Sequence, residues 1–246
     1  SMGNSIPKEV YVYVISWLNN PSQLISTLPQ IIGNATNTTN YLIKIKDNNP
    51  ATVIKALIIG AIPAISISPT KIVTTTDGIN DYVYVGGSSI TGGIYRIVND
   101  SSPNTIPYIA AASTNGIFDV DETAKKLYFS NSVGTLVTIR DLSIASVPDI
   151  TMTTPYINIT EIKISPDGNK LLIAGRAIVT IIDTPIIDIY TKNALGTWKL
   201  TNRSTFIPNI GTNNIVTEIV INKASTFAYA VNPIGTMRSE EHTSEL

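Results

Sequence analysis

The stretch Ile162-Lys-Ile-Ser-Pro-Asp-Gly168, followed closely by Leu171-Leu-Ile-Ala-Gly175, decides the fold of this 246-residue chain. The first segment alternates apolar and polar residues and then ends in Pro-Asp-Gly. Proline supplies a fixed φ, aspartate a side-chain cap and glycine a positive φ, which together make a tight turn. The second segment is continuously apolar, as in a strand buried on both faces. The stretch therefore predicts two strands joined by a tight turn.

This strand–turn–strand unit recurs along the chain. Further copies of the alternating strand are expected at Ile65–Pro69, Phe118–Glu122 and Ile219–Lys223. Further copies of the apolar strand are expected at Val12–Ser16, Val83–Gly87, Leu127–Asn131 and Ala228–Asn232. A third strand that ends in an acidic or amide residue is expected at Lys44–Asp47, Arg96–Asn99, Thr138–Asp141 and Thr180–Asp183. A looser fourth strand follows at Thr52–Ile59, Thr105–Ala110, Asp149–Thr153 and Thr197–Thr201.

The spacing of the copies predicts the architecture. Val83 lies 44 residues before Leu127, and Leu127 lies 44 residues before Leu171. Four strands in each 40–50 residues make one blade of a β-propeller. The sequence therefore predicts an all-β chain, a β-propeller of four-stranded blades. A β-sandwich and a right-handed β-solenoid are the alternatives, but a sandwich gives no reason for this period and a solenoid usually has a shorter one.

The blade count predicts an open arc. Residues 8–237 hold about four blades, beginning in mid-blade at Val10 and ending after the second strand of the last. We expect a partial ring whose end faces expose apolar side chains from Val10–Ile15 and Phe227–Val231. The first strands should lie side by side at the inner edges of successive blades, with these residues buried: Ile67, Val120, Ile164 and Ile221.

The repeats resemble the YVTN-type propeller repeat, which runs roughly I-x-I-S-P-D-G-K-x-L-Y-V-A-N and then V-x-V-I-D-T. Residues 162–175 and 178–184 match this pattern nearly position for position, and the resemblance covers residues 8–235. The family implies a seven-bladed ring with a central channel, found in surface-layer proteins, periplasmic binding proteins and lactonase-like enzymes. The chain departs from it at residues 70–80, where a turn is expected to be longer, and at 186–194, an expected insertion before a fourth strand.

Composition excludes several classes of function. The net charge is −1 and no cluster of Lys and Arg is present, which excludes non-specific binding to nucleic acids and adhesion to anionic membranes. No apolar run approaches the ~20 residues of a membrane-spanning helix, so membrane insertion is not expected. The chain has no cysteine, which excludes disulfides, thiolate nucleophiles and cysteine-based zinc sites. No cofactor is expected.

The last nine residues differ in character from the rest. Residues 238–246 are polar and acidic, and they resemble the translation of a sequencing-adapter oligonucleotide. We expect this tail to be non-native and to pack against nothing. The single histidine of the chain, His242, lies in it. Histidine-dependent catalytic triads and zinc sites are therefore not expected in residues 8–237.

Two glutamates are the candidate ligand-binding residues. Glu161 and Glu218 both come one residue before an expected first strand, and such strands begin at the mouth of a propeller channel. Two carboxylates there can hold a cation or perform acid–base chemistry. The alternative is that each is a solvated loop residue. The acidic residues Asp119, Asp121 and Glu122 are explained by a turn at the position of Ser-Pro-Asp in the next blade.

Two classes of function remain open. The first is a non-enzymatic binding or surface scaffold, whose partner is a protein, a glycan or a small ligand. Low charge with much Thr and Asn is typical of an exposed secreted, periplasmic or cell-surface protein. The second is a lactonase-like hydrolase that uses channel-facing carboxylates together with an arginine. The expected positions of Arg96, Arg140 and Arg176, on or beside third strands, favour the scaffold.

Overall fold

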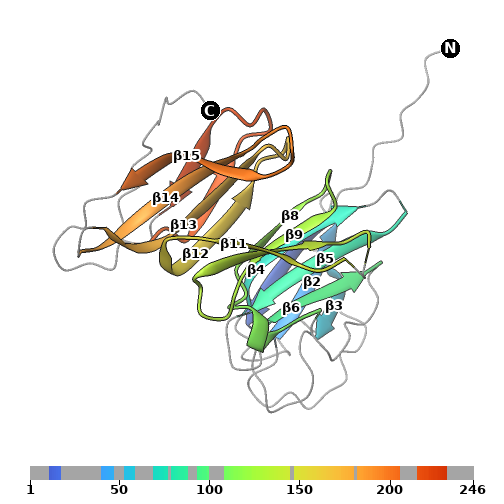
Figure 1. Ribbon diagram of the computed structural model, residues 1–246. Coiled ribbons are helices and arrows are strands. Elements are labelled where there is room, and N and C mark those ends of the chain that lie inside the picture. The colour runs from blue at the N-terminus through green and yellow to red at the C-terminus, as the bar shows by residue number, and fades with distance from the viewer. Residues whose placement is uncertain are drawn as a thin grey trace.

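The computed structural model describes residues 11–17, 40–46, 53–58, 69–76, 79–87, 93–99, 108–144, 147–179, 182–205 and 215–231. These residues form five antiparallel sheets that follow one another in chain order (Figure 1). Beyond one short 3-10 turn at Ala111–Ser113, the described elements are all strands. Among the described residues, no helix is long and apolar enough to cross a membrane.

Each sheet is built from strands that are consecutive in sequence. The first contains β1 (Tyr11–Trp17), β2 (Asn40–Lys46) and β3 (Val53–Ile58). The second contains β4 (Pro69–Thr76), β5 (Asp81–Gly87), β6 (Gly93–Val98) and β7 (Ile109–Ala110). The third contains β8 (Phe118–Asp121), β9 (Lys126–Ser130), β10 (Leu136–Asp141) and β11 (Ile150–Thr153). The fourth contains β12 (Tyr156–Ile164), β13 (Lys170–Val179), β14 (Ile182–Lys192) and β15 (Trp198–Thr205), and the fifth β16 (Glu218–Ile221) and β17 (Ala228–Val231).

The sheets meet along their first strands, as in a propeller. β8 contacts both β4 and β12, and β12 contacts β16. Ile164 and Ile221 therefore lie on neighbouring strands of different sheets, which confirms the prediction of successive blades. Val120 and Ile164 are buried as expected, whereas Ile221, at the end of β16, is only half-buried. Ile67 lies outside the described residues.

The core consists of apolar layers between successive sheets. One layer joins the second and third sheets through Tyr84, Phe118 and Phe129. The next joins the third and fourth sheets and contains Leu171 and Ile173 of β13. Leu172 and Ala174, which alternate with them on β13, belong instead to the layer shared with Ile219 of the fifth sheet. The continuous apolar run of β13 is thus buried on both faces, which confirms the prediction made from its sequence.

The first strand of the second sheet is displaced from its predicted position. It was expected at Ile65–Pro69 with a long turn over residues 70–80, but β4 is Pro69–Thr76. The run Lys71-Ile-Val-Thr-Thr-Thr76 is rich in β-branched residues, which favour strands. Pro69 is its first residue, where a missing N–H is tolerated. Residues 65–68 lie outside the described part of the chain.

The fourth sheet has longer strands than predicted. The third strand was expected at Thr180–Asp183, but β13 continues to Val179 and β14 runs from Ile182 to Lys192. The expected insertion at 186–194 is therefore mostly strand, and Asp183 lies near the start of β14. Ile178 is 56% exposed, because β12 pairs with β13 only as far as Ala177.

The apolar face predicted at the C-terminal end of the repeats is present. Phe227, Tyr229 and Val231 are 44%, 48% and 44% exposed. The side chains of residues 10–15 and the tail at 238–246 lie outside the part that can be described. Those two predictions remain predictions.

Close approach of the second and third sheets requires glycine at position 86. A Cβ on Gly86 would lie 2.3 Å from the carbonyl oxygen of Gly116 and 2.7 Å from the Phe118 ring. We expect Gly86→Ala to lower the free energy of unfolding by about 2–3 kcal/mol, measured by urea denaturation. The control is Gly196→Ala, where a Cβ meets nothing within 4 Å and the positive φ alone should cost about 1 kcal/mol. Equal costs at the two positions would contradict the close packing.

Candidate functional site

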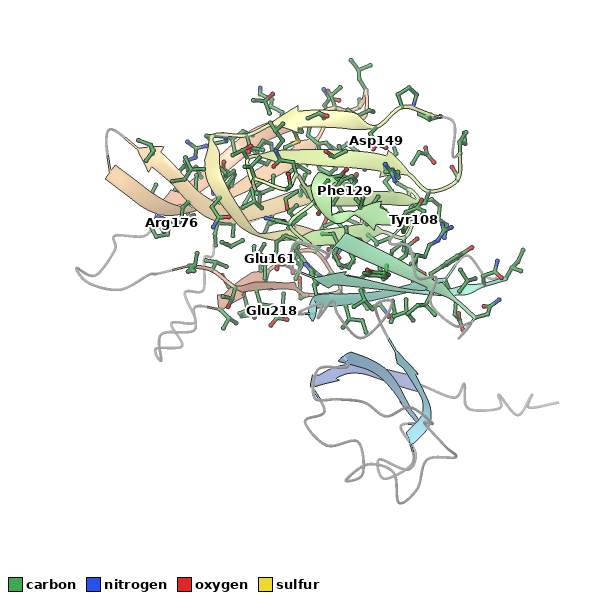
Figure 2. All side chains as sticks on the ribbon, turned by 90° about the horizontal axis from the view of Figure 1, so that it is seen from below. Tyr108, Phe129, Asp149, Glu161, Arg176 and Glu218 are labelled. Carbon is green, nitrogen blue, oxygen red and sulfur yellow. The ribbon has the colours of Figure 1, made fainter. Side chains whose placement is uncertain are left out.

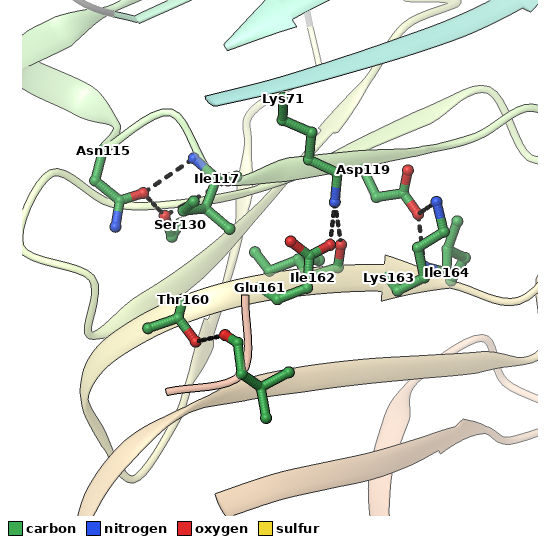
Figure 3. A network of polar contacts seen from close by, with 11 residues as sticks. Lys71, Asn115, Ile117, Asp119, Ser130, Thr160, Glu161, Ile162, Lys163 and Ile164 are labelled. Carbon is green, nitrogen blue, oxygen red and sulfur yellow. Dashed lines mark hydrogen bonds and ion pairs between the residues drawn. The ribbon is translucent and has the colours of Figure 1, made fainter. Parts of the chain in front are cut away.

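Four charged side chains gather where the inner strands of three sheets meet. This inner-strand cluster consists of Lys71 on β4, Asp119 on β8, and Glu161 and Lys163 on β12 (Figure 3). The Lys71 ammonium donates a hydrogen bond to Glu161 Oε1 and another, of 2.8 Å, to the carbonyl oxygen of Ile162. Lys71 therefore links the second sheet directly to the fourth.

Glu161 is the most perturbed acid of this cluster. Its side chain is buried, with the residue 4% exposed. Burial raises the pKa of Glu161 from 4.5 to about 7, and the charge of Lys71 opposes this increase only in part. The negative charge of Asp119 raises the pKa further, while Lys163 lowers it. The carboxyl group is thus poised to titrate near neutral pH.

Asp119 ties the third sheet to the fourth. Its Oδ2 atom accepts a hydrogen bond of 2.9 Å from the backbone N–H of Ile164 and lies 3.4 Å from the ammonium of Lys163. Farther along β12, the Thr160 hydroxyl donates to the carbonyl oxygen of Val216, just before β16, at 2.6 Å. Side-chain hydrogen bonds to the neighbouring backbone therefore fix the spacing between successive inner strands.

A cleft of about 430 Å³ opens beside this cluster. We call it the inner cleft, because strands β4, β8, β12 and β16 all contribute to its walls. Its polar lining residues are Asp119, Asp121, Glu122, Thr123, Lys163, Ser165 and Glu218, and its apolar lining residues are Val73, Val120, Ile164, Pro166, Ile219, Val220 and Ile221. The walls therefore combine apolar side chains with an excess of carboxylates.

The structure places the two predicted glutamates in different environments. Both lie four residues before the first residue of the following turn, Ser165 for Glu161 and Asn222 for Glu218. Glu161 is buried in the interior of β12, whereas Glu218 is exposed at the start of β16 and lines the inner cleft (Figure 2). β12 contacts both β8 and β16, and these neighbours enclose Glu161. Whether one ligand engages both glutamates remains a prediction.

Asp121 adds a buried carboxylate to the cleft. Its Oδ1 atom accepts a hydrogen bond of 2.8 Å from Ala124 N and so caps the turn, as the sequence predicted. Its Oδ2 atom is buried and has no hydrogen-bond donor, and the nearest ion-pair partner is the ammonium of Lys192 at 3.6 Å. The negative charge of Asp121 is therefore only partly compensated.

Lys71 was not among the predicted site residues, and Asp119 and Asp121 were predicted only as turn residues. Lys71 fell in an expected turn because the first strand of its sheet was placed too early. The run of β-branched residues after Lys71 was the signal that could have placed it on the first strand of its sheet. The two aspartates were assigned to a turn alone, and nothing in their spacing reveals that the neighbouring sheet buries them.

Arg96, Arg140 and Arg203 lie away from the inner cleft. Arg140 forms a bidentate ion pair with Asp149 at 2.9 and 2.8 Å, and Arg203 forms one with Asp188 at 2.7 and 2.8 Å. Arg96 stacks over Tyr108, with 4.2 Å between the guanidinium carbon and the ring centroid. These contacts involve third and fourth strands, and Figure 2 shows Tyr108 and Asp149 well separated from Glu161 and Glu218. In the described ranges, no three His, Cys, Asp or Glu side chains are grouped to hold a metal ion.

Comparisons with solved structures show the fold. A protein from Bacteroides fragilis, provisionally assigned as a 6-phosphogluconolactonase, has a TM-score of 0.51 at 12% identity, covering 78% of this chain and 57% of that one. A structure from the nidogen–laminin complex has a TM-score of 0.52 at 17% identity, covering 79% and 68%. The chain is a β-propeller. It spans little more than half the length of the B. fragilis protein. No family model and no curated protein matches the chain.

The burial of Glu161 predicts a dependence of stability on pH. Its folded-state pKa of about 7 lies above the ordinary 4.5, so the folded state binds this proton more tightly than the unfolded state. The stability that this proton contributes is present below pH 4.5 and is lost as the pH rises to about 7. We expect the wild type to lose on the order of 3 kcal/mol across this window relative to Glu161→Gln, measured by urea denaturation.

The matched control is Glu218→Gln, at the equivalent but exposed position. That side chain is exposed, so the control removes a carboxyl group without removing a buried charge. A difference between wild type and Glu161→Gln that stays constant from pH 4.5 to about 7 would contradict the burial of the Glu161 carboxyl group.

Proposed function

We propose that this protein is a non-enzymatic binding scaffold of β-propeller type, with the inner cleft as its ligand-binding face. The observation that carries the proposal is the composition of the cleft. Apolar side chains and partly compensated carboxylates line it together, while the described arginines that form ion pairs do so on outer strands. Mixed apolar and polar walls suit recognition of a ligand.

The proposal is further supported by the residue types in the described part of the chain. It contains no histidine and no cysteine, which excludes a Ser–His–Asp or Cys–His arrangement there. Glu161, the acid with a pKa near neutrality, is engaged by the ammonium of Lys71. One of the similar solved structures comes from a complex between two proteins. We further propose that the repeats are of the YVTN type and that the scaffold acts outside the cytoplasm, at a cell surface or in a secreted form.

A lactonase-like hydrolase is the second candidate. The observation that favours it is the pKa of about 7 at Glu161, because acids tuned in this way recur at catalytic sites. The likeness to the protein provisionally assigned as a 6-phosphogluconolactonase points the same way. The described part of the chain, however, brings no arginine to the inner cleft to bind a phosphate or stabilise an oxyanion.

Blocking the inner cleft should abolish ligand binding. Thr123 is an exposed turn residue on the cleft wall, so Thr123→Trp should fill the cleft without disturbing the core. In a thermal-shift screen of peptides, oligosaccharides and small metabolites, we expect wild-type ligands to stabilise the protein by about 2.7 kcal/mol at 100 times Kd. Thr123→Trp should lose this stabilisation. The matched control is Thr153→Trp on the exposed fourth strand β11, which should retain it.

Lactone hydrolysis separates the two candidates. We expect 6-phosphogluconolactone and δ-gluconolactone to open no faster with the protein than in buffer, measured by pH-stat titration. Rate acceleration that Glu161→Gln lowers at least 100-fold, with Glu218→Gln as comparison, would establish the hydrolase and overturn the scaffold.

A further inference from the structure

We propose that the inner cleft binds a peptide segment of a partner protein through a basic side chain, arginine or lysine. This inference rests on the scaffold function proposed above and specifies the chemistry of its ligand. It draws on the charge of the cleft walls, on a buried carboxylate beside the cleft and on the apolar surface between them.

The charge of the cleft favours a cation. Four carboxylates line it, those of Asp119, Asp121, Glu122 and Glu218, against the single ammonium of Lys163. Glu122 and Glu218 are exposed, so their charges reach the ligand from the rim. A concave surface lined by one sign of charge concentrates ligands of the opposite sign.

Asp121 supplies an independent indication. The residue is 3% exposed, one oxygen caps a turn, and the buried Oδ2 atom has no hydrogen-bond donor. Buried carboxylates are normally satisfied by donors, since leaving one incomplete is costly. The ammonium of Lys192, at 3.6 Å, compensates this charge only loosely. A cationic group in the cleft would add to this compensation without touching the buried oxygen.

The apolar part of the walls favours a peptide over a bare cation. Val73 comes from β4, Ile164 and Pro166 come from the end of β12 and the turn after it, and β16 adds Ile219, Val220 and Ile221. The methylene stem of an arginine or lysine packs on such surface while its head group meets carboxylates. A volume of about 430 Å³ is in the range of pockets that enclose whole ligands. A metal ion is disfavoured because the described carboxylates form no group of three around one point.

A randomised peptide library tests the inference without a known partner. A phage-displayed heptapeptide library is selected on the immobilised full chain, and the recovered sequences are compared with the input. We expect enrichment of arginine or lysine at one position, with an apolar residue next to it. A synthetic peptide with the most enriched sequence should bind the protein at least 10-fold more weakly when its arginine is replaced by citrulline or its lysine is replaced by norleucine. Binding should also weaken as salt is raised.

Charge-neutral variants locate the binding site. Glu122→Gln and Glu218→Gln should each weaken binding of the synthetic peptide about 2- to 5-fold, and the double variant about 10-fold. The matched control is Asp81→Asn, an exposed acid at the start of β5 outside the cleft, which should leave binding unchanged. Circular dichroism and thermal melts confirm that each variant is folded.

Four results would overturn the inference. They are recovery of no peptide, recovery of neutral or acidic peptides, equal affinity of the wild type and the double variant for the synthetic peptide, and competition by a polyamine. Full competition by spermidine at the affinity of the peptide would assign the site to small polyamines instead. If neutral or acidic peptides bind the wild type but not Thr123→Trp, the scaffold function is supported and only the preference for a basic side chain is contradicted. If Thr123→Trp leaves ligand binding unchanged, the proposed function of the inner cleft is itself contradicted.

Discussion

The structure depends on the packing of sheets that are apolar on both faces. β13 shows the constraint most clearly, because Leu171 and Ile173 belong to the layer shared with the third sheet while Leu172 and Ala174 belong to the layer shared with the fifth. A sheet of this kind needs a neighbour on each face, since fully burying one such aliphatic side chain is worth about 1.5–3 kcal/mol. Successive sheets must therefore stack in sequence order around their first strands.

The stacking brings the inner strands close enough for side chains of one sheet to bond the backbone of the next. Asp119 accepts from Ile164 N, and Thr160 donates to the carbonyl of Val216. Buried polar groups are tolerated there because they are hydrogen-bonded, and the bonds set the register of the inner strands. The same register brings the carboxylates of Asp119 and Asp121 into the wall of a cleft whose other walls come from the neighbouring sheets.

The sequence predicted most strands, because their signal is local. Alternation, β-branched residues and turn residues place the expected apolar strands on β1, β5, β9, β13 and β17. Errors occurred where two local patterns competed. The Ser-Pro ending at Ser68-Pro69 resembled the turn of the fourth sheet, and the β-branched run after it decided β4. The strands of the fourth sheet were expected to be as short as those of the other sheets, but β13 and β14 form a longer hairpin.

The sequence by itself determined the all-β class, the repeated blade and the burial of β13 on both faces. It also singled out Glu161 and Glu218 as equivalent positions. Only the tertiary structure decided that one is buried and the other exposed, and that Glu161 pairs with Lys71, 90 residues away. The physical reason is that such a pair depends on how sheets are arranged around the inner strands. Strand periodicity fixes which face a residue occupies, whereas the side chain it meets across the cluster depends on the packing of three sheets.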